Sequence, residues 1–135
     1  MRQRVVKALR PLDAISVENS AYPGTPDVNY VEGWIELKWV REWPAREGTA
    51  VPVKHFTPQQ RVWLKRRWYR NGAAWLLLQV GRTWLLFDGA TASQIVGLVD
   101  KRTLINRARR VWFSGLVDKE LEEWLISNQR PRRGF

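Results

Sequence analysis

The sequence predicts an α/β domain in which a central mixed β-sheet of about five strands is flanked by helices. Three features favour this class: two pairs of β-rich runs around two-residue turns, a well-capped basic helix between the pairs, and helical segments near the end of the chain. The chain has 135 residues, of which 44% are hydrophobic and 12% aromatic. This composition excludes a disordered chain, and the length suits one domain with its own core.

The elements expected before the central helix are short. They are a helix over residues 2–10, a strand over 13–19, and a hairpin of strands over 27–31 and 34–40. Pro11 ends the first helix. Glu32 and Gly33 are expected to form the two-residue hairpin turn, which would place Val31 opposite Trp34. Residues 41–56 contain two prolines and a glycine, and we expect an exposed loop there.

The central helix has clear boundary signals. Thr57 is the expected N-cap, Pro58 occupies the first helical position, and Gln60 completes a capping box. The helix is predicted to end near Arg70, before Asn71-Gly72.

The elements after the central helix are a second hairpin and a helical extension. They are strands over 73–80 and 83–88, followed by helices over about 92–99, 104–113 and 118–127. We therefore expect a single domain over 1–135, with a core over about 13–90, a C-terminal helical extension over about 91–129 and a basic tail over 130–135.

The charge distribution indicates a polyanion as partner. The net charge is +10, and residues 54–72 carry six basic residues and no acidic one, whereas residues 11–53 carry a net charge of −4. Lysine and arginine side chains bind phosphates with release of counterions. A merely solvated basic surface is the alternative. The absence of cysteine and the single histidine exclude a thiolate zinc site, a thiol nucleophile and a multi-histidine metal site.

No apolar run approaches the length of about 18 residues that a membrane span needs. The basic N-terminal segment lacks the apolar core and cleavage site of a signal peptide. We therefore expect a soluble, cytoplasmic protein without a membrane partner.

Three ionisable residues are expected on one face of the first hairpin. With the turn at Glu32-Gly33, Asp27 lies opposite Lys38, and Glu36 is its diagonal neighbour. Two neighbouring carboxylates suit a hard divalent cation such as Mg²⁺, and a lysine beside them can stabilise charge on a phosphoryl oxygen. The alternative is a solvated strand face with a cross-strand ion pair.

The same residues carry a family resemblance. Pro26-Asp27, eight intervening residues and Glu36-Leu37-Lys38 resemble the PD-(D/E)xK motif of the restriction-endonuclease-like nuclease superfamily. The segments YPGTPDVNYVEGWIELKWV and HFTPQQRVWLKRRWYRNGAAWLLLQVG, within a match over roughly 13–88, resemble the VRR-NUC branch and related phage or archaeal Holliday-junction-resolvase-like nucleases. The resemblance implies a restriction-endonuclease-like core, and a location in the host cytoplasm if the protein is phage-encoded.

The resemblance also implies roles for individual residues. Asp27, Glu36 and the backbone carbonyl of Leu37 would bind the metal, and Lys38 would position or polarise the hydrolytic water. Glu18 resembles an additional acidic residue near the metal, with a surface carboxylate at a strand end as the alternative. Gln60 resembles a glutamine that contacts the water or the scissile phosphate, although its capping-box position explains it equally well.

We expect DNA to contact the basic residues of segment 54–72, which contains no acidic residue. The central helix is expected to direct its basic side chains outward, and Leu64 and Trp68 towards the core. The basic residues are Lys54, Arg61, Lys65, Arg66, Arg67 and Arg70. Trp39 is expected in the core, whereas Trp43, in the exposed loop, would stack on a base or lie against the surface.

The expected function is an Mg²⁺-dependent endodeoxyribonuclease, a hydrolase for which Mn²⁺ can substitute and whose preferred substrate is branched DNA such as a Holliday junction. A homodimer would place two sites on opposed strands. Its interface would use apolar residues of the extension, namely Ile95, Val96, Leu98, Val99, Trp112, Phe113, Trp124 and Leu125. The alternatives are a non-catalytic nucleic-acid-binding protein that retains the nuclease fold, and an interaction protein whose basic face meets an acidic partner.

Overall fold

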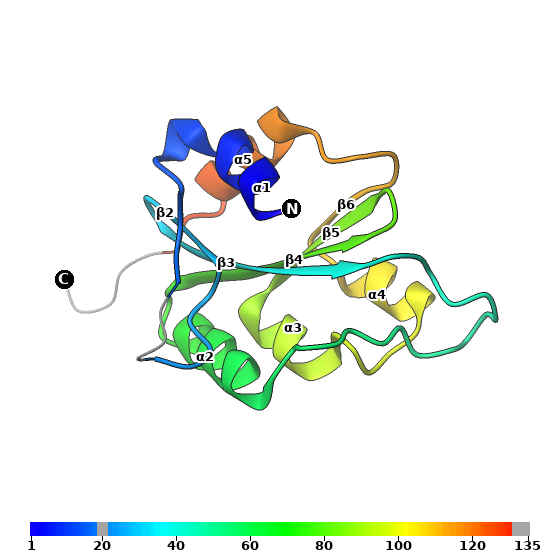
Figure 1. The fold of residues 1–135 in the computed structure, drawn as a ribbon. Helices are drawn as coiled ribbons and strands as arrows, with labels where there is room; N and C mark the ends of the chain where they lie inside the picture. The colour runs from blue at the N-terminus through cyan, green and yellow to red at the C-terminus, as the bar shows by residue number, and fades with distance from the viewer. Residues whose placement is uncertain (19–21, 131–135) are drawn as a thin grey trace.

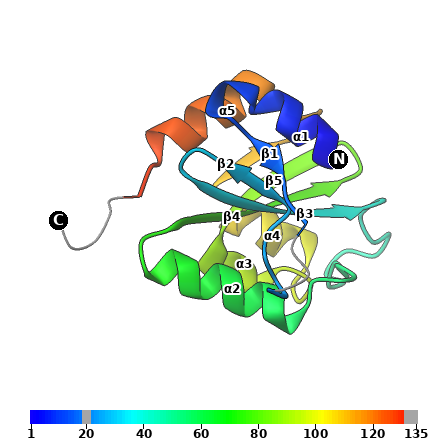
Figure 2. The same cartoon turned by 60° about the vertical axis from the view of Figure 1, so that its left-hand side comes forward.

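The computed structural model describes residues 1–18 and 22–130 and has three layers, with a six-stranded sheet between two layers of helices (Figures 1 and 2). The strands are β1 (Ile15–Ser16), β2 (Val28–Tyr30), β3 (Gly33–Val40), β4 (Ala73–Val80), β5 (Thr83–Asp88) and β6 (Arg110–Trp112). The helices are α1 (Arg2–Ala8), the short 3-10 helix η1 (Arg10–Leu12), α2 (Pro58–Tyr69), α3 (Gly89–Ile95), α4 (Lys101–Arg107) and α5 (Asp118–Ser127). The predicted α/β class and mixed sheet are confirmed.

The strands lie in the sheet in the order in which they occur in the chain. All neighbouring strands are antiparallel except β3 and β4, which are parallel and are joined by the crossover through α2. A parallel pair needs such a long connection, and here the connection also contains the predicted loop over 41–56. Strands β3 and β4 therefore lie in the middle of the six-stranded sheet.

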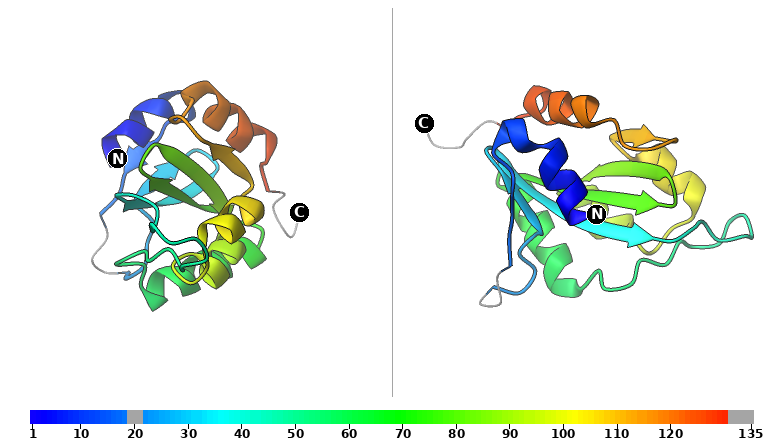
Figure 3. Two further views of the ribbon diagram at one scale, coloured as in Figure 1. Left: turned by 90° about the vertical axis from the view of Figure 1, so that its right-hand side faces the viewer. Right: turned by 45° about the horizontal axis from the view of Figure 1, so that its top comes forward.

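The two helical layers cover opposite faces of the sheet. Helices α1 and α5 lie on one face, and α2, α3 and α4 lie on the other (Figures 1 and 3). Strand β4 is buried along almost its whole length, as its apolar sequence predicts. Leu76 and Leu78 pack towards α2 and α3, whereas Trp75 and Leu77 pack towards α1 and α5.

Helix α2 begins and ends close to the predicted positions. The Thr57 hydroxyl accepts a hydrogen bond from the Gln60 backbone N–H (3.2 Å), and the Gln60 side-chain oxygen accepts one from the Thr57 N–H (3.0 Å). Asn71 follows the helix with φ 63°, the left-handed conformation expected just after a helix end. Leu64 and Trp68 are buried, as predicted.

The hairpin register differs from the prediction. Val28 pairs with Ile35 and Tyr30 with Gly33, so the turn consists of Val31 and Glu32. Gly33 belongs to β3, where it pairs with Tyr30 and Ala73, and glycine is needed there because a Cβ atom would overlap the Ala73 backbone of β4. Continuing the register places Asp27 opposite Glu36, and the predicted pairing of Asp27 with Lys38 is wrong.

The sheet has one more strand than expected. The predicted helix over 104–113 is wrong because α4 ends at Arg107 and the chain continues into β6, where Trp112 pairs with Trp84 of β5. The helix predicted over 92–99 occupies Gly89–Ile95 instead, where the Asp88 carboxylate caps its N-terminus. Trp39 is 59% exposed, so its predicted burial is also wrong. Strand β3 continues to Val40, and in Figure 3 its end extends beyond the part of the sheet that α1 and α5 cover.

Most of the residues predicted for a dimer interface pack inside the chain. Ile95, Val96, Trp112 and Leu125 are buried, while Val99 and Trp124 pack against the core. Only Leu98 and Phe113 of that set are strongly exposed. The C-terminal extension therefore completes the sheet and its covering layers, and most of the apolar residues predicted for the dimer interface are used inside the chain.

Across residues 1–18 and 22–130, no helix has the length and apolar character needed to cross a membrane.

Candidate active site

The loop before Asp27 is positioned by the first turn of α2. Gly24 has φ +91°, and a Cβ atom there would lie 2.5 Å from the Gln59 carbonyl oxygen, so only glycine permits this close approach. The Thr25 hydroxyl donates a hydrogen bond to the Tyr22 carbonyl (2.7 Å) and closes the turn. The sequence around Pro26-Asp27 thus holds Asp27 directly before β2, in a loop that packs against α2.

Asp27 is fixed by two hydrogen bonds from different elements. Its Oδ2 atom accepts one from the backbone N–H of Leu37 (2.9 Å), and its Oδ1 atom accepts one from Nη2 of Arg2 (2.7 Å). Sequence reasoning missed Arg2, because a residue 25 positions away on another element shares no local spacing with Asp27. The net charge of +4 in residues 1–10 was the only available signal.

Glu36 is the most deeply buried charged residue of the site, with 1% of its surface exposed. Its Oε2 atom lies 3.3 Å from Nζ of Lys38, whereas its Oε1 atom is buried and has no hydrogen-bond partner in the described chain. Burial, and then the Asp27 carboxylate, raise the pKa of Glu36 to about 9, although Lys38 opposes this. At neutral pH Glu36 therefore holds a proton unless a further cation is present.

Lys38 is oriented by the loop that precedes α2. Its Nζ atom donates a hydrogen bond to the His55 carbonyl (2.8 Å) and lies 5.8 Å from the centre of the Phe56 ring. His55 has φ 66°, in the left-handed region. Only 10% of the Lys38 side chain is exposed, so its ammonium group is held beside Glu36.

The structure brings together Asp27, Glu36, Leu37 and Lys38 but not the two auxiliary candidates. The Glu18 side chain is 87% exposed and lies 3.4 Å from Nη1 of Arg2, as expected for a surface carboxylate. The side-chain oxygen of Gln60 is engaged in the capping box. A catalytic contact of either residue stays a prediction.

The basic residues predicted to contact DNA divide into two groups. Lys54, Lys65, Arg66 and Arg70 are exposed. Arg61 does not face outward as predicted. Its guanidinium donates hydrogen bonds to the Ser93 carbonyl (3.1 Å) and the Val96 carbonyl (2.7 Å), which ties α2 to the end of α3.

Arg67 is exposed but lies along the protein surface. Its guanidinium carbon is 4.3 Å from the centre of the Trp63 ring, and burial together with Arg66 lowers its pKa. The basic outer surface of α2 is therefore formed chiefly by Lys65, Arg66 and Arg70.

The donor set fits a hard divalent cation that binds two carboxylates. The buried, unpartnered Oε1 atom of Glu36 is the observation that favours this, because a cation would satisfy it and oppose the raised pKa. No group of three acidic, histidine or cysteine side chains that could hold a metal occurs in the described ranges. Arg2 also occupies one oxygen of Asp27, so it competes with a cation for that carboxylate.

Comparisons of the chain with protein-family models, with curated proteins and with solved structures found no match.

Replacing Glu36 with Gln should stabilise the metal-free protein, increasingly so as the pH rises. The folded protein keeps the Glu36 proton up to about pH 9, whereas the unfolded chain loses it near pH 4.5. Between these values the unfolded state binds fewer protons, so the stability of the native protein falls as the pH rises. Glutamine does not titrate, so the variant does not lose stability from this cause as the pH rises. Urea unfolding in EDTA at several pH values measures the difference.

The Glu18→Gln variant is the control, because Glu18 is exposed. Its stability curve should run parallel to that of the native protein. If the stability curve of Glu36→Gln also runs parallel to that of the native protein, Glu36 is not a buried carboxyl group with a raised pKa.

Proposed function

We propose that the protein is a divalent-metal-dependent endodeoxyribonuclease with a restriction-endonuclease-like core. The single observation that carries the proposal is the buried Glu36 carboxyl group, with one unpartnered oxygen, between Asp27 and Lys38. An acidic pair beside a held lysine suits hydrolysis of a phosphodiester bond, in which negative charge develops on the phosphoryl oxygens.

The residues of the site would divide the chemistry between them. Asp27 and Glu36, with the carbonyl of Leu37, would hold Mg²⁺ or Mn²⁺. Such an ion activates water and stabilises charge on phosphate oxygens. Lys38 is held by Glu36 and the His55 carbonyl, and would donate a hydrogen bond to a non-bridging phosphate oxygen or to the attacking water. Water adds to phosphorus, the bond to the leaving sugar oxygen breaks, and that oxygen gains a proton.

The basic surface of α2 supports DNA as the substrate. Lys65, Arg66 and Arg70 are exposed on the helix whose first turn packs against the loop before Asp27. Arg66 lines a pocket together with Pro23, so a phosphate bound at Arg66 would lie beside the loop that leads to Asp27. Branched DNA, such as a Holliday junction, is the substrate that the family resemblance suggests, and we place the activity in the cytoplasm or, for a phage-encoded protein, in that of the host.

A second candidate function is non-catalytic binding of nucleic acid by a protein that retains the nuclease fold. One observation favours it: the guanidinium of Arg2 lies 2.7 Å from Asp27, where it neutralises a carboxylate that the nuclease needs for its metal. A cleavage assay separates the two functions.

Replacing Asp27 with Asn should abolish Mg²⁺-dependent cleavage and leave DNA binding intact or slightly tighter. The substitution removes a metal ligand and also removes a charge that repels phosphate. Incubation with linear, flap and four-way-junction DNA, with and without Mg²⁺, measures cleavage, and anisotropy in EDTA measures binding. The control is Asp118→Asn, because Asp118 also pairs with an arginine of α1, Arg4, but lies on α5. Cleavage by Asp27→Asn at the native rate would show that the metal-site assignment is wrong.

Replacing Lys38 with Met should reduce the cleavage rate about 10²-fold or more, with little change in Kd for DNA. This is the pattern of a group that acts mainly in the transition state. Lys119→Met, on the opposite helical layer, is the control. A defect confined to Kd would make Lys38 a phosphate contact instead.

Replacing Lys65 and Arg66 together with Ala should weaken binding to all DNA sequences about equally. Each lost phosphate contact should reduce the slope of log K against log salt concentration by about 0.9 for duplex DNA. The charge-matched control replaces Lys7 and Lys119, which are exposed on α1 and α5. If both double variants keep the native slope, the outer surface of α2 does not contact DNA.

A further inference from the structure

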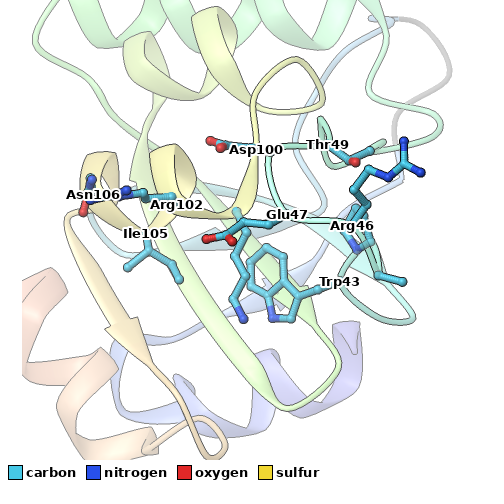
Figure 4. Close-up of a pocket in the computed structure, with 12 residues that line it drawn as sticks. Trp43, Arg46, Glu47, Thr49, Asp100, Arg102, Ile105 and Asn106 are labelled. Atoms are coloured by element: carbon cyan, nitrogen blue, oxygen red, sulfur yellow. The ribbon is translucent and has the colours of Figure 1, made fainter.

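A pocket lies between the loop after β3 and helix α4, and none of the residues of the acidic pair lines it. Its volume is about 750 Å³, within the range of sites that bind small molecules. Figure 4 shows Trp43, Arg46 and Glu47 on the loop wall and Arg102, Ile105 and Asn106 on the α4 wall.

The walls combine an aromatic ring with positive charge. Nζ of Lys101 lies 5.1 Å from the centre of the Trp43 ring, and Arg46 and Arg102 also line the pocket. Trp43 packs partly against the core, and the remainder of its side chain is exposed and lines the pocket. Proteins that bind single-stranded nucleic acid use this combination: bases stack on aromatic rings, and cationic side chains contact the backbone.

Two carboxylates in the same walls argue against a simple phosphate site. Glu47 and Asp100 line the pocket, and hydrogen bonds from Thr103, chiefly, lower the pKa of Asp100, so it stays ionised. Carboxylates repel a free phosphate but accept hydrogen bonds from the amino groups of bases. The pocket therefore matches a whole nucleotide, with its base, better than an isolated anion.

The loop that forms one wall is anchored at its far end. Ala50 forms a β-bridge with Asp100, and the Val51 backbone N–H donates a hydrogen bond to the Val99 carbonyl (2.8 Å). The Val51 side chain is fully buried. This end of the loop wall is thus held at the start of α4 without a ligand, which reduces the part of the wall that binding must order.

The same loop also reaches the acidic pair. It leaves β3 just after Lys38 and returns at His55, whose carbonyl accepts the hydrogen bond from Lys38. Trp43 is five residues after Lys38, a chain length that spans at most about 17 Å at roughly 3.4 Å per residue. At most about five nucleotides with the stacking distance of a duplex, roughly 3.4 Å each, would fit within that reach.

We propose that this pocket binds one unpaired nucleotide of a DNA strand, with its base on Trp43 and its backbone against Lys101, Arg46 and Arg102. A strand held in this way would extend towards Lys38. Flaps, gaps and junctions offer unpaired nucleotides, so the pocket would favour them over intact duplex; this role in substrate choice rests on the proposed nuclease function.

The test is the affinity of the full chain for single-stranded and duplex DNA in EDTA, where no cleavage occurs. The Trp43→Ala variant should lose about tenfold or more in affinity for a fluorescein-labelled single strand, which is the usual contribution of one stacked base. Its affinity for a blunt duplex of the same length should stay close to the native value. Trp43→Phe, which keeps an aromatic face, should restore most of the single-strand affinity.

The matched control is Trp39→Ala, which removes an exposed tryptophan from the end of β3, outside the pocket. It should bind both DNA forms like the native protein. Photocrosslinking of the native protein to a strand that contains 5-iododeoxyuridine, followed by mass spectrometry, should identify Trp43, and this result does not depend on the folding of any variant.

The proposal is overturned if Trp43→Ala binds single strands as tightly as Trp39→Ala does, or if the crosslink maps to residues outside the pocket. Because these measurements need no metal, they separate the two proposals. If the protein cuts no DNA but crosslinks at Trp43, the pocket proposal is supported and the nuclease proposal is overturned. If the protein cuts DNA but gives no crosslink at Trp43, the nuclease proposal is supported and the pocket proposal is overturned.

Discussion

The burial of Glu36 in the middle of the sheet is the constraint on which the candidate site depends. An ionised carboxylate in such a place is unfavourable without compensating charge. The fold supplies one partner, Lys38, on the same strand and brings a second carboxylate, Asp27, next to Glu36. Arg2 pairs with Asp27, but the buried Oε1 atom of Glu36 has no partner among the described residues, and a divalent cation would supply one.

The surrounding elements hold this arrangement in place. The parallel pairing of β3 and β4 fixes Glu36 opposite Leu76, so the carboxyl group lies on the face that α2 and α3 cover. The first turn of α2 packs against Gly24 and thereby sets the loop that carries Asp27. Arg61 ties α2 to α3, and Lys38 ties β3 to the loop before α2. The loop that carries Trp43 is bound to Val99 through Val51 and to Lys38 through the His55 carbonyl, so one loop contributes to both the pocket and the acidic site.

The features that could be predicted from the sequence have local causes. The capping box of α2 needs only Thr57 and Gln60, and the apolar run of β4 needs only its own composition. The shared face of Asp27 and Glu36 was also predictable, even though the turn was misplaced. The true register differs by two residues, and side chains two apart lie on the same face of a strand.

The features that could not be predicted depend on distant contacts. Gly33 looks like a turn residue until the backbone of Ala73 is placed beside it. Strand β6 forms because the edge of β5 accepts Val111 and Trp112, which the local sequence does not reveal. The ion pair of Arg2 with Asp27 joins two elements with no common pattern. Trp39 has the composition of a core residue, yet the covering helices do not extend over it.

The most direct test of the account is a Mn²⁺ titration of the DNA-free protein, followed by electron paramagnetic resonance of the free ion. The native protein should bind Mn²⁺ at a site that Glu36→Gln lacks, and Arg2→Ala should bind it more tightly because Asp27 is released. Arg4→Ala, which removes the neighbouring arginine of α1 that pairs with Asp118, should bind like the native protein. Equal Mn²⁺ binding by the native protein and Glu36→Gln would contradict the central claim that Glu36 and Asp27 form a divalent-cation site.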